Sequence, residues 1–424
     1  MSDTIFAVSS GAPPAAIAIV RVSGPVAFAT IRTAIGSLPQ PRVAGLRAIR
    51  DPTSGDLLDR ALVLLFPGPD SATGEDLAEL HLHGGRAVVH AVEAMLGRQP
   101  KLRPAEAGEF TRRALIAGRI DLSQAEGLGD LLSAETESQR RAAIGAAEGL
   151  VSREVLGWTQ RVLALAAEVE AVLDFSDEDD VIEAHDIAPR AMMLGTEIAA
   201  VAGGPVTERL RDGIRVVLAG PPNSGKSTLF NALVEREAAI VSPIAGTTRD
   251  RIEAPIARDG IAYVLTDTAG LTETDDPIEA IGVARAREAL AGGDVILWLG
   301  EEAPNGNAIW VQARADEPGR GALLAGRALS VSAQTGNGMA ALWRAVGAHA
   351  ATLLPRLDGV ALNRRQQTLC LECAAELGQV GKCRDLLLMA EHLRRARVAL
   401  DRILGTADVE AMLDGLFGRF CIGK

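Results

Sequence analysis

Apolar and polar residues follow two different periods along this chain, and the changes of period mark its organisation. Residues 1–116 mix short β-branched runs with helical spacing, which predicts a small α+β domain. The clearest strand patterns there are Ile17–Val22, Arg60–Phe66 and Glu79–His83, and Ala87–Leu96 has a helical pattern. In residues 117–212 apolar side chains recur at helical spacing, which predicts a helical segment.

The second half of the chain repeats this contrast. Residues 213–349 alternate strand and helix patterns, as a doubly wound nucleotide-binding domain does. The predicted strands are Arg215–Ala219, Ile261–Thr266, Asp294–Leu299, Ala308–Gln312 and Ala328–Val331. Residues 350–424 are helical again, most clearly over Leu386–Leu404. We therefore expect an inserted α/β domain between two helical halves, which pack together because neither has much core alone.

Gly220–Thr228 carries a complete phosphate-loop pattern between a predicted strand and a predicted helix. Its glycines let the backbone curl so that successive N–H groups face phosphate oxygens, and the helix N-terminus adds its positive dipole end. We expect Lys226 to neutralise the β- and γ-phosphates and Ser227 to hold Mg²⁺. The predicted nucleotide contacts in this loop are Asn223, Ser224, Gly225, Lys226, Ser227 and Thr228.

Three further motifs favour a GTPase over a generic ATPase. A switch loop at Ser242–Asp250 contains threonines that can reach Mg²⁺ and the γ-phosphate. After the next strand, Asp267 is expected to hold Mg²⁺ through water, and the Gly270 N–H to sense the γ-phosphate. The loop Ser332–Gly336 suits a position beneath a guanine base, and its predicted contacts are Ser332 and Ala333.

Two positions depart from the common GTPase pattern. Leu271 stands where many GTPases place a water-orienting Gln, so another residue must orient the attacking water. Asn223 lies inside the phosphate loop, where its side-chain carbonyl can coordinate a monovalent cation beside the phosphates. Such a cation would do the charge work of an arginine finger.

The composition of the chain limits the kinds of partner and cellular location that we expect. The net charge of −12 argues against a generally basic nucleic-acid binder, so an RNA partner must meet a local patch or a second protein. The four cysteines all lie near the C-terminal end, which is no disulfide framework, and Cys370-x-x-Cys373 is interpreted as part of a helix. No signal peptide opens the chain and no apolar run approaches roughly 18 residues, so we expect a soluble, cytoplasmic protein with no membrane partner.

The final residues, Phe420-Cys421-Ile422-Gly423-Lys424, are the most specific signal. Together with Gly246–Asp250, Thr73–Asp76 and Ile120–Glu126, this ending resembles the MnmE (TrmE) family of bacterial tRNA-modification GTPases. The resemblance covers the whole length and also includes Asp3–Ile5, Ile19–Gly24, His83–Gly85 and Pro104–Thr111.

The resemblance implies a multidomain α+β and α/β protein. An α+β tetrahydrofolate-binding and dimerisation domain would span 1–116, a helical domain would combine 117–212 with 350–424, and a Ras-like doubly wound P-loop G domain would span 213–349. With the flavoprotein MnmG, such a homodimer adds a carboxymethylaminomethyl or aminomethyl group to C5 of the wobble uridine of certain tRNAs, which it meets through the complex. The one-carbon donor would be a 5-formyl or methylene tetrahydrofolate derivative.

By motif match, the resemblance also implies roles for individual residues. Folate contacts fall on Arg21, Glu79, Arg119 and Lys424, with Cys421 near that pocket. For Cys421, a thiol nucleophile and a packing role both fit the sequence.

The resemblance assigns the ions and the catalytic water as well. K⁺ falls on Asn223, Ser242, Ile244 and Thr247, and Mg²⁺ on Ser227 and Thr248. Glu279 matches the acidic residue that orients the attacking water, which answers the question that Leu271 raises. The implied catalytic residues are Glu279, Lys226 and Thr248, and G domains of two copies would meet across their nucleotides.

Two other functions fit parts of the chain. A ribosome-assembly or switch GTPase without a modification role explains neither the N-terminal third nor the Cys-Ile-Gly-Lys end. A folate-dependent one-carbon transferase with a degenerate, merely structural G domain does not explain the intact set Lys226, Ser227, Thr248, Asp267 and Glu279. The sequence therefore favours a K⁺-dependent tRNA-modification GTPase.

The guanine-reading position departs from the usual Asn-Lys-x-Asp pattern. The chain has Ala313-Arg314-Ala315-Asp316 there, in which Asp316 can accept from guanine N1 and N2 and Arg314 can stack over the base. Ala313 cannot supply an amide. The connection Gly300–Asn307 is also too short for the helix that normally joins two parallel strands, so we expect a trimmed domain.

We therefore predict lowered affinity or selectivity for guanine nucleotides, because one base-reading amide is missing at Ala313. Competition of GTP, ITP and ATP for binding measures this. An undiminished, high selectivity for GTP would contradict the prediction.

Overall fold

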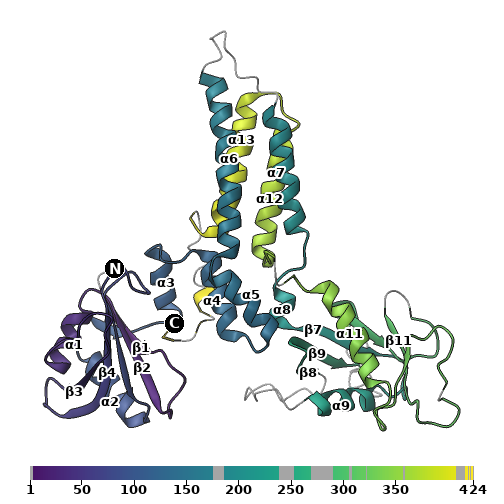
Figure 1. The fold of residues 1–424 in the computed structure, drawn as a ribbon, viewed down its shortest axis with the longest axis horizontal. Coiled ribbons are helices and arrows are strands. Elements are labelled where there is room, and N and C mark those ends of the chain that lie inside the picture. Colours follow the sequence, from purple (N-terminus) through teal and green to yellow (C-terminus); the bar gives the residue numbers. More distant parts are fainter. Residues whose placement is uncertain are drawn as a thin grey trace, which may run out of the picture. The chain divides into compact units, whose positions relative to one another are not determined.

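The computed structural model describes residues 3–174, 186–237, 253–268, 290–304, 308–320, 322–356, 359–406 and 416–418, together with Phe420, Ile422 and Gly423. The chain divides into two compact units, and Figure 1 labels most of their elements. The first unit comprises Met1–Gly129, Ala147–Val155 and Leu400–Lys424, and the second comprises Asp130–Ala146 and Leu156–Ala399.

A six-stranded sheet with the order β3-β4-β5-β2-β1-β6 forms the first unit. Its helices α1 and α2 share one hydrophobic core with the strands, and residues such as Val20, Leu80 and Leu82 face that core. Alternate residues of a strand point to opposite faces, so Arg21 and Glu79 belong to the other face. The elements are β1 (Thr4–Val8), β2 (Ile17–Ser23), α1 (Ala27–Ile35), β3 (Gly45–Arg50), β4 (Leu57–Phe66), β5 (Leu77–His83), α2 (Arg86–Gly97), β6 (Leu102–Pro104), α3 (Glu109–Ile116) and α4 (Leu122–Ser133).

The structure confirms the strands predicted from the pattern at 17–22, 60–66 and 79–83, as β2, β4 and β5, and the predicted helix as α2. The pattern missed β1, β3 and β6. Of these, β1 is buried over Thr4–Ala7 on both faces, so it lacks the alternation that identifies a half-buried strand. One of its faces packs against α3, where Phe110 contacts Ile5 and Ala7.

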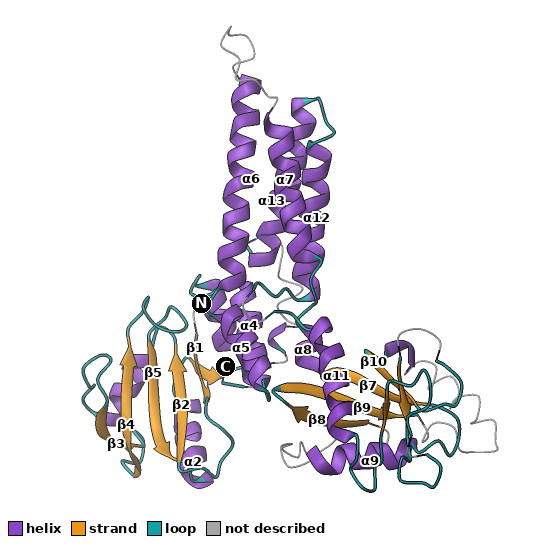
Figure 2. Cartoon of the chain, turned by 45° about the vertical axis from the view of Figure 1, so that its right-hand side comes forward, coloured by secondary structure: helices purple, strands orange, loops and turns teal. Residues whose placement is uncertain are grey.

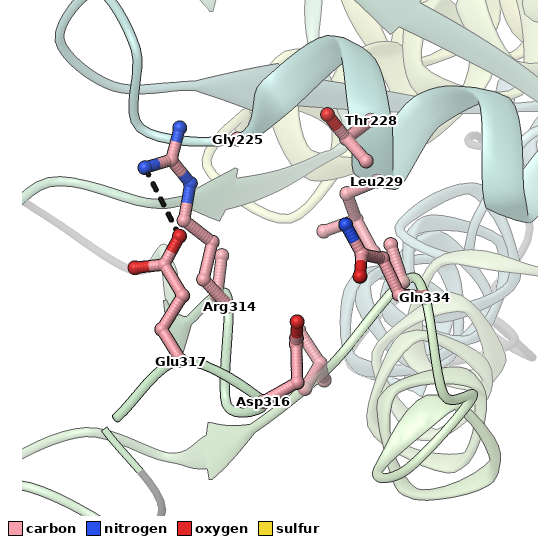
Figure 3. Close-up of a pocket in the computed structure, with 10 residues that line it drawn as sticks. Gly225, Thr228, Leu229, Arg314, Asp316, Glu317 and Gln334 are labelled. Atoms are coloured by element: carbon pink, nitrogen blue, oxygen red, sulfur yellow. Dashed lines mark ion pairs between the residues drawn. The ribbon is translucent and has the colours of Figure 1, made fainter. Parts of the chain in front are cut away.

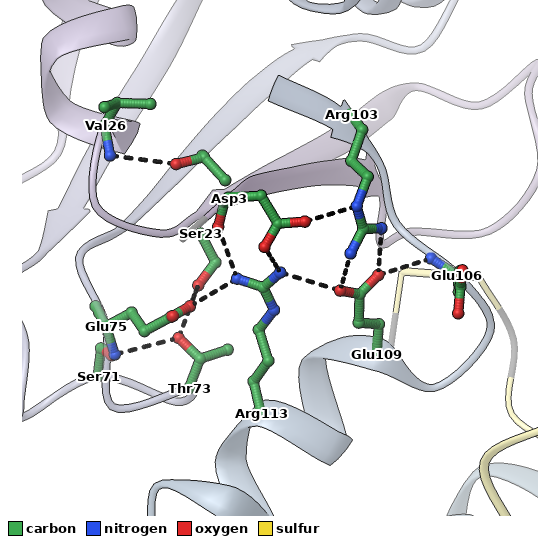
Figure 4. Close-up of polar contacts among 11 residues, drawn as sticks. Asp3, Ser23, Val26, Ser71, Thr73, Glu75, Arg103, Glu106, Glu109 and Arg113 are labelled. Carbon is green, nitrogen blue, oxygen red and sulfur yellow. Dashed lines mark hydrogen bonds and ion pairs between the residues drawn. The ribbon is translucent and has the colours of Figure 1, made fainter. Parts of the chain in front are cut away.

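A buried ion network ties α3 to the sheet, and Figure 4 shows it. The Arg113 side chain is 1% exposed and donates to Glu109 at 2.9 Å, Glu75 at 3.0 Å and Asp3 at 3.1 Å. Arg103 bridges Glu109 and Asp3, each at 2.6 Å. Burial of Glu109 opposes its ionisation, but hydrogen bonds from Arg103 and Arg113 outweigh it and lower the pKa of Glu109.

Helices from both sides of the α/β segment pack together in the second unit. Figures 1 and 2 show α6, α7, α12 and α13 side by side. Helices α7 and α12 approach closely at Gly195, where an added Cβ would lie 3.1 Å from the Ala374 carbonyl oxygen. No helix among the described residues combines the length and apolar character that a membrane span requires. The helices are α5 (Glu137–Ala147), α6 (Leu150–Asp174), α7 (Ile187–Ala202), α8 (Glu208–Asp212), α12 (Arg364–Val380) and α13 (Leu386–Leu404).

The α/β segment forms a second six-stranded sheet, with the order β12-β11-β10-β7-β9-β8. All neighbours pair in parallel except β8 and β9. The predicted strands are confirmed, whereas β8 was missed because Pro255 argues against a strand; β8 is an edge strand, where proline is tolerated. The elements are β7 (Ile214–Ala219), α9 (Lys226–Glu237), β8 (Glu253–Arg258), β9 (Ile261–Asp267), β10 (Val295–Trp298), β11 (Ile309–Gln312), β12 (Leu329–Ser330) and α11 (Met339–Leu353).

The connections on either side of β11 contain no helix in the part of the chain that is described. Two indole groups fasten the first connection, because Trp298 donates to the Glu302 carbonyl at 2.8 Å and Trp310 to the Gly300 carbonyl at 2.9 Å. Gln312, which is 2% exposed, fastens the second by hydrogen bonds to the backbone of Arg320, Ala322 and Leu324. Side-chain hydrogen bonds thus order the short connections where helices would otherwise pack.

Replacing Arg113 by Met should lower the unfolding free energy of the first unit by about 3–5 kcal/mol, because it removes the buried cation from a carboxylate cluster. Hydrogen exchange in peptides from β1 and β2 measures the loss. The pKa values of Glu109 and Asp3 are lowered in the folded state, so this stabilisation is present above their unfolded pKa values, near 4, and disappears as the pH falls through the folded values.

The control is Arg98→Met, which breaks the Arg98–Asp51 ion pair, where Arg98 has a half-exposed side chain. Exposed ion pairs contribute little, so protection should hardly change. Equal protection in the two variants at neutral pH would contradict the importance of the buried network.

Candidate functional site

The phosphate loop joins β7 to α9, and its backbone shows why these residue types stand there. Gly220, Asn223 and Gly225 have φ values of 148°, 57° and 95°. Glycine adopts this range freely, and Asn tolerates the left-handed conformation better than most residues. Gly220 also has a close neighbour, because an added Cβ would lie 3.2 Å from the Gly300 nitrogen. The curl predicted from the sequence is therefore present.

Three predicted phosphate and Mg²⁺ contacts meet at the carboxyl ends of β7 and β9. The Lys226 side chain is 5% exposed, and its ammonium group donates to the carbonyls of Gly220 at 2.9 Å and Pro221 at 2.8 Å. Asp267 is buried at the end of β9, directly opposite Leu218 of β7. Ser227 is exposed in the first turn of α9. A lysine ammonium, a hydroxyl and a carboxylate are thus gathered at one edge of the sheet.

A cavity of about 240 Å³ adjoins this loop, and its lining includes Asp316 and Ala333, two of the predicted base contacts. Gly225 and Thr228 line one part of it, and segments 313–317 and 331–334 contribute the rest. Figure 3 shows Arg314 and Glu317 on one side and Gln334 on the other. Asp316 accepts a 2.5 Å hydrogen bond from the Ser332 hydroxyl, which joins the two loops. The structure therefore brings Asp316, Ser332 and Ala333 together with the phosphate loop.

Arg314 occupies the position of the usual lysine. Its backbone is left-handed, with φ of 60°, and its Nε lies 3.4 Å from where a Cβ of Gly225 would be. The guanidinium group pairs with Glu317 at 3.4 Å. Arg314 therefore packs over the phosphate loop, in the lining of the cavity.

A second, larger cavity of about 880 Å³ lies on the other flank of the phosphate loop. It is lined by Pro221–Ser224, by Trp298 at the end of β10 and by residues of the shortened connections, including Arg320 and Arg327. Gln312 holds this region in place, and sequence analysis missed that role. The sequence contains a signal for this role of Gln312, because it directly follows the apolar residues Ile309–Val311. A Gln is unusual in a buried strand.

Several predicted site residues lie outside the described part of the chain, and the structure says nothing of their positions. In the switch regions these are Ser242, Ile244, Thr247, Thr248, Gly270 and Glu279. At the C-terminal end they are Cys421 and Lys424. Leu271, which raised the question of the water-orienting residue, also lies outside it.

The predicted folate contacts Arg21 and Glu79 meet on the face of the first sheet opposite α1 and α2. Arg21 lies between Ala7 of β1 and Glu79 of β5 in the strand register. Its Nε donates to one carboxylate oxygen of Glu79 at 2.9 Å, and His81 contacts the other oxygen at 3.3 Å. The period-two spacing of His81 from Glu79 places both residues on the same face.

Arg119 contacts the loop that precedes β5. Its guanidinium group pairs with Asp70 at 3.5 Å, and its Cγ lies 3.6 Å from where a Cβ of Gly74 would be. The same loop contacts β2 through Ser23, whose hydroxyl lies 2.8 Å from that of Thr73. Arg119 is thus linked to β2 through the loop, and within the described residues no contact joins it directly to Arg21 or Glu79.

The C-terminal residues dock against β1 and the start of α3. Ile422 forms a β-bridge with Ala107, and the Gly423 carbonyl accepts a 2.7 Å hydrogen bond from the Ser9 hydroxyl. Upstream, Phe417 and Phe420 pack with Leu122 of α4. Gly423 has φ of 97°, and an added Cβ would overlap the Val8 carbonyl oxygen. The end of the chain therefore reaches the strand that neighbours Arg21.

The Cys370-x-x-Cys373 pair lies in α12, as predicted, with both side chains fully buried. Burial raises the pKa of each thiol to about 12. The thiolate is the nucleophile and metal ligand, so neither cysteine is reactive at neutral pH.

Comparison with known proteins covers nearly the whole chain. The family model described as the GTP-binding protein TrmE N-terminus matches residues 4–119, and that of the MnmE helical domain matches residues 122–421. Three relatives named tRNA modification GTPase MnmE are among the most similar. That of Erythrobacter litoralis is 56% identical over 428 residues, with 100% of both chains covered.

The relative from Rhizorhabdus wittichii is 56% identical over 429 residues, covering 100% of this chain and 97% of its own. That of Novosphingobium aromaticivorans is 53% identical over 443 residues, covering 100% of both. The Erythrobacter alignment exceeds the 424 residues of this chain by only four positions, so that relative has no room for added crossover helices. These matches show that the chain belongs to the MnmE family of tRNA modification GTPases and is a GTP-hydrolysing enzyme.

Proposed function

We propose that this chain couples K⁺-stimulated GTP hydrolysis to wobble-uridine modification, with an MnmG-like flavoprotein and a tetrahydrofolate derivative. The group added to C5 is carboxymethylaminomethyl or aminomethyl. The proposed parts are the folate domain at 1–116, the helical domain at 117–212 and 350–424, and the G domain at 213–349. The observation that carries the folate part of this proposal is the contact of Gly423 with Ser9, at the end of the strand that neighbours Arg21.

In the hydrolysis step, Lys226 would hold the β- and γ-phosphates, and a bound Mg²⁺ would supply charge neutralisation. The exposed Ser227 hydroxyl and the Asp267 carboxylate are oxygen donors, which suits Mg²⁺. The roles of Thr248 on Mg²⁺ and of Glu279 on the attacking water are proposed from their family motifs alone. The guanine base lies between Arg314 and the loop at Ser332, with its N1 and N2 donors on Asp316.

The exposure and the hydrogen bonding of the Asn223 side chain support the K⁺ proposal. Its side chain is exposed, and its amide has no hydrogen-bond partner in the described chain. The left-handed backbone at this position is one that Asn tolerates, so the loop geometry and a cation-binding carbonyl coexist in one residue. Ser242, Ile244 and Thr247 would complete the coordination. K⁺ would also promote contact between the G domains of two copies.

The folate proposal is supported by complementary chemistry. A pterin ring presents N–H donors that the Glu79 carboxylate can accept, and Arg21 holds that carboxylate in place. Arg119 and Lys424 supply positive charge for the carboxylates of the folate tail. Cys421 would lie near this pocket. The net charge of −12 is consistent with tRNA being met through the flavoprotein complex.

A second copy of the chain would complete the N-terminal domain as a homodimer. The sheet face that bears Glu79 also exposes large apolar side chains, including Ile17 at 58%, Leu46 at 64% and Leu62 at 43%. Leu46 and Leu62 are directly opposite each other in neighbouring strands. Exposed apolar side chains gathered on one sheet face favour a protein–protein contact, and a face that meets its own copy suits a twofold dimer.

We expect the initial rate of GTP hydrolysis to be at least about tenfold higher in KCl than in NaCl at equal ionic strength, because K⁺ would act as an arginine finger does. Asn223→Gly should abolish most of this ratio, since glycine keeps the left-handed backbone and removes only the carbonyl. Pro222→Ala is the matched control in the same loop. Neither proline nor alanine has a side-chain oxygen, so this change should leave the ratio of rates unaltered. Equal rates of the unchanged chain in the two salts would remove the K⁺ assignment.

Gly423→Ala should weaken binding of 5-formyltetrahydrofolate by at least about tenfold, measured by calorimetry, because the C-terminal residues can no longer dock on β1 and Lys424 loses its position. GTP hydrolysis should persist in this variant. Gly157→Ala is the control, since nothing lies within 4 Å of the added methyl group. Unchanged folate affinity in Gly423→Ala would separate the C-terminus from the folate site.

A further inference from the structure

We propose that Gln334 recognises the acceptor edge of the guanine base and so replaces the amide that is missing at Ala313. The proposal rests on the proposed function in one respect, namely that the base of GTP occupies the cavity between α9 and the loops 313–317 and 331–334. It names a specificity-determining residue in that cavity. Three observations on the described residues and one chemical argument carry it.

The first observation concerns what the cavity offers a guanine base. Guanine has a donor edge, N1–H and the N2 amine, and an acceptor edge, O6 and N7. Asp316 is an acceptor and suits the donor edge. Ala313 lines the cavity with a methyl group that is only 7% exposed, and a methyl group cannot donate a hydrogen bond to the acceptor edge. A side-chain donor for O6 or N7 must therefore come from elsewhere in the lining.

The second observation is that Gln334 is the one side-chain amide among the described residues that line this cavity. Figure 3 shows it across the cavity from Arg314. Its residue is exposed, and within the described chain its amide has no hydrogen-bond partner. A carboxamide carries two N–H donors, so Gln334 has the chemistry that O6 and N7 require.

The third observation is that the backbone holding Gln334 is ordered relative to Asp316. The Ser332 hydroxyl donates to Asp316 at 2.5 Å and accepts from the Thr335 N–H at 3.1 Å. The Ser332 N–H donates to the Asn337 carbonyl at 2.9 Å. Gln334 thus sits in a tight turn whose first residue is bonded to Asp316, so the donor and the acceptor for the base are positioned by one connected loop.

The chemical argument concerns the length of the Gln334 side chain. A carboxamide on a longer stem than that of Asn can rotate and present either its N–H groups or its oxygen to the base. It can therefore donate to the O6 of guanine or accept from the N6 amine of adenine. Discrimination between the bases would then depend mainly on Asp316, which agrees with the lowered selectivity predicted from the sequence.

The test uses the full chain and equilibrium binding of a fluorescent GTP analogue, with competition by GTP and ATP. Gln334→Leu keeps the shape of the side chain and removes the amide, and we expect GTP affinity to fall about three- to tenfold. Gln334→Glu, which replaces the donor by an acceptor, should weaken binding at least as much. Asn337→Ala is the matched control, because it removes an exposed amide from the same turn without altering the cavity lining.

A compensating change makes the test specific. If Gln334 supplies the missing amide, then Ala313→Asn in the Gln334→Leu background should recover at least half of the lost affinity. Should Gln334→Leu and Gln334→Glu both bind GTP as tightly as the unchanged chain, the assignment of Gln334 is overturned. A compensated variant that folds, by circular dichroism, but recovers nothing would also overturn it.

Asp316→Asn separates this proposal from the one on which it rests. Asparagine donates where aspartate accepts, so this variant should lose GTP and gain XTP, whose C2 oxygen replaces the amine. If Asp316→Asn leaves GTP affinity unchanged, the base does not bind in this cavity and both proposals fail. If Asp316→Asn shifts the preference to XTP while Gln334→Leu has no effect, only the role of Gln334 fails.

Discussion

A phosphate loop must turn several consecutive backbone N–H groups toward one point, and this constraint organises the second unit. The loop satisfies it with left-handed backbone at Gly220, Asn223 and Gly225. Two of these positions use glycine, and the third uses a residue that tolerates the conformation and also presents a carbonyl. Because the loop follows the buried strand β7, its geometry is set by the sheet, and Lys226 and Asp267 are gathered around it.

The first unit depends on a different constraint, which is the compensation of buried charge. Arg113 is almost inaccessible to water, so its guanidinium group requires the carboxylates of Asp3, Glu75 and Glu109. These partners come from the start of the chain, from the loop before β5 and from α3. The same loop carries Gly74, against which Arg119 packs. Charge compensation thus positions segments that are distant in sequence around the face of Arg21 and Glu79.

The α/β domain has short connections beside β11, and side-chain hydrogen bonds order these connections in place of packed helices. Two crossover connections lack helices in the described chain, yet β10, β11 and β12 still pair in parallel. Trp298, Trp310 and Gln312 provide the hydrogen bonds that order the short connections. Near the phosphate loop, Ala313 has no side-chain amide, and Gln334 of the neighbouring loop presents one to the same cavity.

The sequence alone determined the elements whose apolar period is strong, the phosphate loop and the helical setting of Cys370 and Cys373, because these depend on neighbours within a few residues. It also indicated Arg21 and Glu79, but only through a family resemblance. Tertiary structure decided the rest. Strand register placed Arg21 beside Glu79, docking placed Gly423 on Ser9, and loop closure placed Gln334 across from Arg314. Such pairings depend on contacts between distant segments, and no local period encodes which of them will meet.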